Sequence, residues 1–195
     1  MIYSNCKWHS KNFIYQGVCI FICLFCLNIA SFSQETLTFT RKFTKKLDKH
    51  GIEFYYPIER WLKLSDKRKD DFMTYDVVLH SPPDIEARID IDKDHRRLYP
   101  NIEIASLLAH ISTNDEDALI EYTKYPNRRA KEEYGADLVL YADFTPKESF
   151  SDYPNGRALI LYKEGEALIK YIILYEQYLD PFFKLPLKFG TEEQG

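Results

Sequence analysis

Cysteine is absent from most of this chain. The four cysteines among its 195 residues all lie between positions 6 and 26. The rest of the chain therefore forms no disulfide, and it offers neither a thiolate nucleophile nor a cysteine ligand for a metal ion. A domain without disulfides is held together by its hydrophobic core, and about 160 residues are enough to build one.

A hydrophobic run long enough to span a bilayer is also missing from the leader. The apolar run Val18–Ala30 has thirteen residues, whereas a membrane-spanning helix needs about 20. A mildly basic start precedes this run, and small residues at Ser31 and Ser33 follow it, which predicts a signal peptide over residues 1–33. With cleavage before Gln34 we expect a secreted or periplasmic protein with no transmembrane segment. A leader retained as an anchor is the alternative.

Positive charge is in deficit. The whole chain has a net charge of −4, and loss of the leader removes Lys7 and Lys11 but no acidic residue, so the net charge becomes −6. Proteins that bind nucleic acid usually carry a basic face, and we therefore expect no nucleic-acid partner. No repeat or Gly/Ser linker divides the sequence, which indicates a single domain over residues 34–180. We expect an extended, partly disordered tail over residues 181–195.

Hydrophobic periodicity predicts an α+β domain with a mostly antiparallel sheet covered by helices. Apolar residues at helical spacing predict helices over 100–113 and over part of 115–134, the second ended by Gly135. The last strand is apolar on both faces and should lie in the middle of the sheet. The predicted strands are 36–43, 52–57, a short strand near Trp61 before a charged loop, 72–80, 85–92, 138–144, 158–163 and 167–176.

The segment "GIEFYYPIERW", residues 51–61, resembles the aromatic-proline-tryptophan opening of PsbP-like domains. The order of strands and helices that follows is similar as well. The resemblance implies an α/β/α sandwich and a family of exported proteins that mostly bind partners and share no catalysis. It assigns no site residue.

Three aspartates recur at every second position in "ARIDIDKDHRR". Asp90, Asp92 and Asp94 match positions one, three and five of an EF-hand calcium loop, which also needs glycine at position six and glutamate at position twelve. Here those positions hold His95 and Asn101. The same spacing is that of the polar face of a strand. We expect no metal and no cofactor, with the three aspartates and His95 as the candidates if a metal binds.

The pairing of strand 85–92 with strand 72–80 follows from its charges. If "SPP" is the loop, Val77 lies opposite Ala87 and Asp76 lies opposite Arg88. A shift of two residues sets Asp76 against Asp90, and facing like charges are destabilising. We therefore predict the first register; the second would favour a cation site.

Glu103, Ser106 and His110 form the polar stripe of the helix over 100–113. Ser106 and His110 are spaced as a nucleophile and a base would be, but no Gly-rich loop or G-x-S-x-G elbow accompanies them. We interpret this stripe as the solvated side of the helix and expect no catalytic residue.

Aromatic residues are the remaining signal, with 15 Tyr and 13 Phe. Exposed aromatic side chains on a sheet bind sugars or partner proteins. We predict an exported, non-catalytic binding or accessory protein whose partner is a protein or small molecule outside the cytoplasm. Two alternatives are a small secreted hydrolase, with or without a metal ion, using Asp and His groups such as His80, His95 or His110, and an envelope subunit that docks through residues 181–189. The candidate ligand-binding residues are Tyr55, Trp61, Tyr141, Tyr162 and Tyr171.

Overall fold

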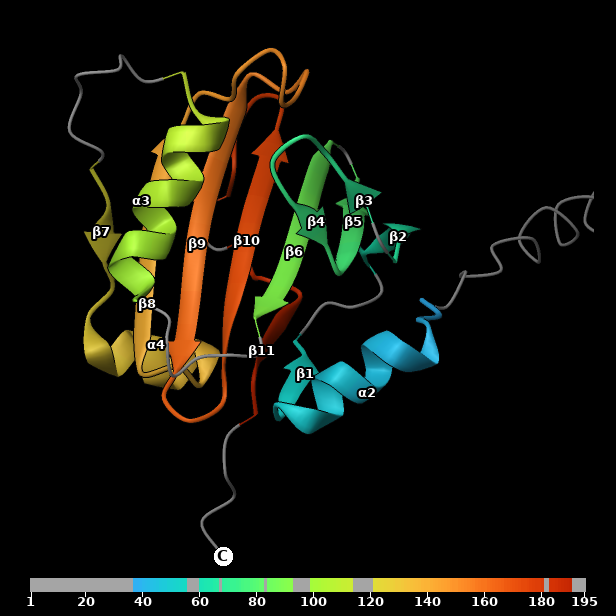
Figure 1. Ribbon diagram of the computed structural model, residues 1–195, viewed down its shortest axis with the longest axis vertical. Coiled ribbons are helices and arrows are strands. Elements are labelled where there is room, and N and C mark those ends of the chain that lie inside the picture. The colour runs from blue at the N-terminus through green and yellow to red at the C-terminus, as the bar shows by residue number, and fades with distance from the viewer. Residues whose placement is uncertain are drawn as a thin grey trace, which may run out of the picture. The chain divides into compact units, whose positions relative to one another are not determined.

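The computed structural model describes residues 37–55, 60–66, 68–82, 84–92, 99–113, 121–180 and 183–190. These residues form an α+β fold built on a seven-stranded antiparallel sheet, as the sequence predicts (Figure 1). The predicted leader over 1–33 lies outside the described residues, as do Asp94 and His95. Within the described ranges, no helix is long and apolar enough to cross a membrane.

The predicted central strand lies in the middle of the large sheet. Ala167–Tyr175 (β10) pairs with Ile85–Asp92 (β6) on one side and with Asn155–Lys163 (β9) on the other. Its apolar side chains face both layers of core, which confirms the expectation from its two apolar faces. The sheet order is β2 (Leu62–Ser65), β5 (Val77–Ser81), β6, β10, β9, β8 (Leu138–Phe144) and β7 (Thr123–Lys124).

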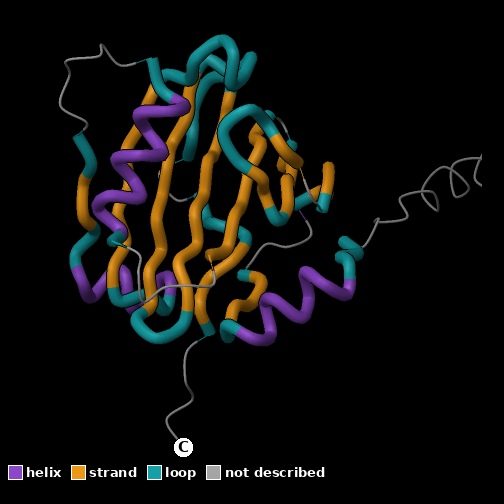
Figure 2. The backbone as a smooth tube through the Cα atoms, in the orientation of Figure 1, coloured by secondary structure: helices purple, strands orange, loops and turns teal. Residues whose placement is uncertain are grey.

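Helices cover both faces of this sheet (Figure 2). Helix α3 (Pro100–Ile111) packs on one face, with Pro100 at its first position. The other face is covered by α2 (Arg41–Lys49), by α4 (Asn127–Tyr134) and by a ribbon of β1 (Ile52–Phe54) and β11 (Leu187–Phe189). A hairpin of β3 (Arg68–Lys69) and β4 (Thr74–Tyr75) lies beside β5.

The predicted strand over residues 36–43 is wrong, because the chain enters α2 at Arg41. The alternation of Leu37 and Phe39 stops at Thr40, whose side chain accepts a hydrogen bond from the Phe43 N–H at 3.3 Å and so caps the helix. Phe43 and Leu47, four residues apart, then form its buried side.

The described part of the predicted tail belongs to the core. Leu187 and Phe189 are fully buried, and β11 pairs with β1. The Tyr171 hydroxyl donates to the Leu187 carbonyl at 2.6 Å and accepts from the Leu187 N–H at 2.9 Å. Gly135 ends α4 at a φ of +61°, as predicted, and the Phe189 carbonyl approaches so closely that a Cβ at this position would clash. The described residues 183–190 therefore belong to the fold beyond the predicted boundary at residue 180, and the buried side chains of Leu187 and Phe189 cannot dock elsewhere.

The predicted register of the β5–β6 hairpin is also wrong, by two residues. Val77 lies opposite Ile89 rather than Ala87, and Val78 lies opposite Arg88. Asp76 lies between β4 and β5, outside both strands. Its carboxylate accepts a hydrogen bond from the Ile91 N–H at 2.9 Å. The repulsion that we expected between Asp76 and Asp90 is offset by two lysines from elsewhere in the chain, described next.

Candidate functional site

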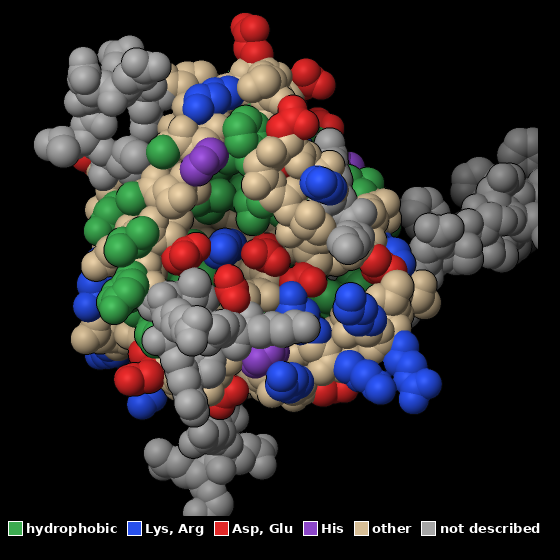
Figure 3. Space-filling model, in the orientation of Figure 1, with side chains coloured by type: hydrophobic (Ala, Val, Ile, Leu, Met, Phe, Trp, Pro, Cys, Tyr) green, Lys and Arg blue, Asp and Glu red, His purple; other side chains and the backbone are tan. Residues whose placement is uncertain are grey.

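Basic side chains gather over α2 (Figure 3). Beside them lies a cavity of about 500 Å³ between α2 and the segment from β4 to the start of β5, which we call the basic cleft. The residues lining the basic cleft are Thr40, Lys42, Phe43, Lys45, Lys46, Lys49, Asp66, Thr74, Tyr75 and Asp76.

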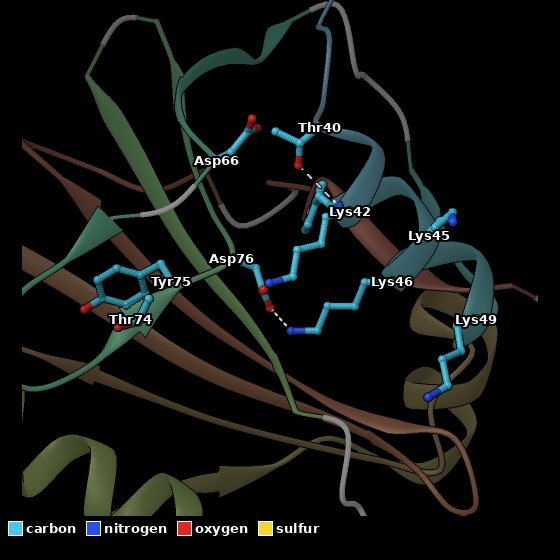
Figure 4. A pocket seen from close by; sticks show the side chains of 10 residues that line it. Thr40, Lys42, Lys45, Lys46, Lys49, Asp66, Thr74, Tyr75 and Asp76 are labelled. Carbon is cyan, nitrogen blue, oxygen red and sulfur yellow. Dashed lines mark hydrogen bonds and ion pairs between the residues drawn. The ribbon is translucent and has the colours of Figure 1, made fainter.

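The four lysines of the cleft divide into two pairs by direction. Lys42 and Lys46 are four residues apart on α2, and both extend toward Asp76 (Figure 4). Lys46 forms an ion pair with Asp76. Lys45 and Lys49, also four apart, extend away from Asp76 (Figure 4). All four lie on one side of the helix, because residues at this spacing fall within about 100° of one another. The first pair points into the cleft and the second lines its outer edge.

Most of this positive charge is not neutralised by neighbouring acids. Lys42, Lys45 and Lys49 are exposed, and none forms an ion pair with another residue that the structure describes. Asp66 is already 3.2 Å from Lys63. The lining has four lysines and two aspartates, so the cleft carries an excess of positive charge and is suited to an anionic group.

An acidic cluster lies beyond Asp76 on the α3 side of the sheet, where Figure 3 shows acidic side chains around a basic one. Lys170, at the middle of β10, lies 3.8 Å from Asp90, 3.8 Å from Asp92 and 3.0 Å from Glu103 of α3. Burial raises the pKa of Asp90 to about 6, Lys170 lowers it and Asp76 raises it. The carboxylates are thus held together by an ammonium group.

Two of the candidate metal ligands, Asp90 and Asp92, belong to this acidic cluster. Lys170 occupies the position between Asp90 and Asp92 that a bound cation would take, and Glu103 completes its surroundings. Across the described ranges, no three His, Asp or Glu side chains are placed to hold a metal ion. Asp94 and His95 lie outside those ranges.

The predicted aromatic residues do not form one surface. Trp61 and Tyr171 are buried in the core, where Trp61 packs against Phe183, so neither can reach an outside ligand. Tyr141 packs with the core layer under α2 and α4, whereas Tyr162 packs with the layer under α3, on the opposite face.

Tyr55 follows β1 and has its own basic neighbours. Its ring lies 4.5 Å from the Lys188 ammonium, and its hydroxyl accepts a hydrogen bond from Lys184 at 3.2 Å. Of the five aromatic candidates, Tyr55, Tyr141 and Tyr162 are at least partly accessible, and they lie on three separate parts of the fold.

The Ser106–His110 pair lines a small cavity of about 170 Å³ beside Phe72 and Lys170. His110 Nδ1 lies 2.6 Å from the backbone carbonyl of Ser106, so this nitrogen carries the proton and donates it to the carbonyl. The contact is therefore to the backbone and not to the Ser106 hydroxyl. The pair lacks the hydrogen bond that would activate a serine nucleophile.

Sequence reasoning missed the lysines that organise both charged regions. The positions 42, 45, 46 and 49 have the i, i+3, i+4, i+7 spacing of one helical face, but this signal was hidden by the expectation of a strand over 36–43. Lys170 appeared only as a polar interruption of an apolar strand.

Comparison of the chain with models of known families, with curated proteins and with solved structures found no match.

Proposed function

We propose that this chain is an exported, non-catalytic binding or accessory protein that takes an anionic ligand in the basic cleft. The observation that supports the proposal is the set of four lysines on one side of a 500 Å³ cavity, three of them without an acidic partner among the described residues. The location outside the cytoplasm rests on the predicted signal peptide.

The cleft favours a compact ligand with two or more negative groups. Lys42 and Lys46 converge at its centre, and a lysine ammonium is a point charge that accepts phosphate, sulfate or carboxylate without a fixed geometry. Thr74 lines the same cavity and adds a hydroxyl that can donate to an anion. Asp76 competes with the ligand for Lys46, because the two already form an ion pair.

Isothermal titration of the full chain with tripolyphosphate tests the proposal, and two substitutions should act in opposite directions. Lys42→Gln removes a charge that points into the cleft and should weaken binding about fivefold, the scale of one partly exposed ionic contact. Asp76→Asn frees Lys46 and should strengthen binding by a similar factor, while the asparagine oxygen can still accept from the Ile91 N–H.

Lys131→Gln on α4 is the matched control, since Lys131 is exposed and far in sequence from the cleft. It should leave the affinity unchanged. The proposal is wrong if Lys42→Gln and Lys131→Gln have equal effects, if Asp76→Asn weakens binding, or if the unsubstituted chain does not bind.

A further inference from the structure

The exposed side of α2 carries a second basic surface, which borders the cleft and shares Lys45 and Lys49 with its lining. Arg41, Lys45 and Lys49 follow one another at intervals of four residues and are all exposed. They form a stripe along the helix, which we call the outer basic face. Asp48 is the only acidic residue of α2, so this stripe is strongly positive on a chain whose net charge is −4.

The outer basic face has the shape for an extended surface rather than for a small ion. Eight residues of helix separate Arg41 from Lys49, which places the ends of the stripe about 12 Å apart. Lys45 and Lys49 lie at the edge of the cleft and extend away from Asp76 (Figure 4), so their ammonium groups do not converge with Lys42 and Lys46 on one anion. Three charges in a row are engaged together only by a partner that presents many negative groups on a plane.

The charge of the rest of the molecule selects among such partners. A long flexible polyanion that wraps the protein would also meet its acidic surface, including the cluster of Asp90, Asp92 and Glu103. A bilayer surface touches one side only.

We propose that Arg41, Lys45 and Lys49 dock α2 onto the anionic headgroups of a lipid bilayer. Basic residues beside a membrane are attracted to anionic lipid, and each contributes about fivefold in partitioning. The attachment is reversible and screened by salt, because all three side chains are exposed to solvent. The contact does not use Lys42 or Lys46, so a docked molecule can still bind a ligand between these two lysines in the basic cleft.

Vesicle co-sedimentation of the full chain tests this inference. Partitioning is measured onto phosphatidylcholine vesicles and onto vesicles that also contain phosphatidylglycerol, at low and at high salt. The apolar run of the leader adds to partitioning onto both kinds of vesicle. The quantity compared is therefore the ratio of the two partition coefficients. We expect the unsubstituted chain to prefer the anionic vesicles by about tenfold or more at low salt and to lose that preference at high salt.

Two triple variants with equal loss of charge separate this surface from general electrostatics. R41Q/K45Q/K49Q should abolish the preference for anionic vesicles. K124Q/R128Q/K131Q removes three exposed basic residues on β7 and α4 and should retain the preference. Thermal unfolding of both variants checks that the fold is intact.

The inference is overturned if partitioning does not depend on the lipid composition, or if the two triple variants lose the preference equally. Titration with tripolyphosphate distinguishes failure of membrane docking from failure of the cleft proposal. Binding of tripolyphosphate that depends on Lys42, without a preference for anionic vesicles, would reject membrane docking and leave the cleft standing. A preference for anionic vesicles without Lys42-dependent binding of tripolyphosphate would reject the cleft proposal and leave membrane docking standing.

Discussion

The two ends of the polar row on β6 differ in burial, although polar and apolar residues alternate in the same way at both ends. Glu86 and Arg88 are only 7% and 3% exposed, and the guanidinium lies 2.7 Å from Glu86 and 4.5 Å from the centre of the Phe150 ring. Asp90 and Asp92, two and four residues further on, remain 23% and 33% exposed at their side chains, and both lie near Lys170.

The two ends differ in the segments that pack over them and not in the strand itself. Phe150 and Tyr75 close over Arg88, and Asp70 approaches it at 3.5 Å, so this end is a buried charge network. Among the described residues, Glu103 of α3 approaches the other end, where the side chains of Asp90 and Asp92 stay partly exposed. An alternation of polar and apolar residues therefore fixes which way side chains point, while distant segments decide whether they stabilise the core or remain accessible.

Removal of the buried guanidinium should have the largest effect. Arg88→Ala takes the positive partner from Glu86 and Asp70 and leaves a gap beneath Phe150, and we expect a loss of about 3–5 kcal/mol in the free energy of unfolding. Urea denaturation measures it. Arg128→Ala is the control, because the Arg128 side chain is 86% exposed although it pairs with Glu132. Its effect should stay within about 0.5 kcal/mol, and a similar loss in both variants would contradict the comparison.

Lys170→Met should have an intermediate effect. The substitution keeps most of the side-chain volume but leaves three carboxylates facing one another, so we expect a loss of about 1–3 kcal/mol at neutral pH. The loss should shrink as the pH falls, because protonation relieves the repulsion. Unfolding curves at several pH values show this trend, and a loss independent of pH would indicate that Lys170 contributes through packing alone.

Asp90→Asn should have an effect of the opposite sign. The pKa of Asp90 is about 6 in the folded chain and 3.8 in the reference state, so the folded chain binds the proton more tightly. The native protein therefore loses stability as the pH rises from about 4 to about 6. Asparagine removes this dependence, and the variant should be more stable than the parent by up to about 3 kcal/mol above pH 6, the free energy of a pKa shift of this size, with little difference below pH 4. Thermal unfolding across this range measures the difference, and a variant less stable at neutral pH would reject the assignment.

The long periodic segments of the fold could be predicted from the sequence. Strand β8 is found at residues 138–144 as expected, and α3 begins at Pro100 as its proline predicts. Gly135 ends α4 because the left-handed turn there suits glycine. These features depend on neighbouring residues alone, which is why local patterns were sufficient.

The incorrect predictions concern features that are determined by residues far apart in the sequence. The β5–β6 register seemed to be excluded by repulsion between Asp76 and Asp90, but Lys46 and Lys170, remote in sequence, provide the compensating charge. Tyr171 was expected at a ligand site because tyrosine is amphipathic, and its hydroxyl is instead satisfied by the backbone of Leu187.

The candidate site itself could be predicted only in part. The aspartates of β6 were recognised, and the interpretation of Asp90 and Asp92 as one side of a strand agrees with the structure, although Glu86 and Arg88 on that side are buried rather than solvated. The basic cleft was not recognised, since it needs both the helical state of α2 and its position beside Asp76.

The ribbon of β1 and β11 joins segments that are made at very different times. Ile52 pairs with Phe189, and the hydroxyl of Tyr171 in the central strand is satisfied only by the backbone of Leu187. Part of the cover of one sheet face is therefore absent until residues 187–189 have been synthesised. Closure of the core on this face therefore depends on a pairing between two segments that are far apart in the sequence.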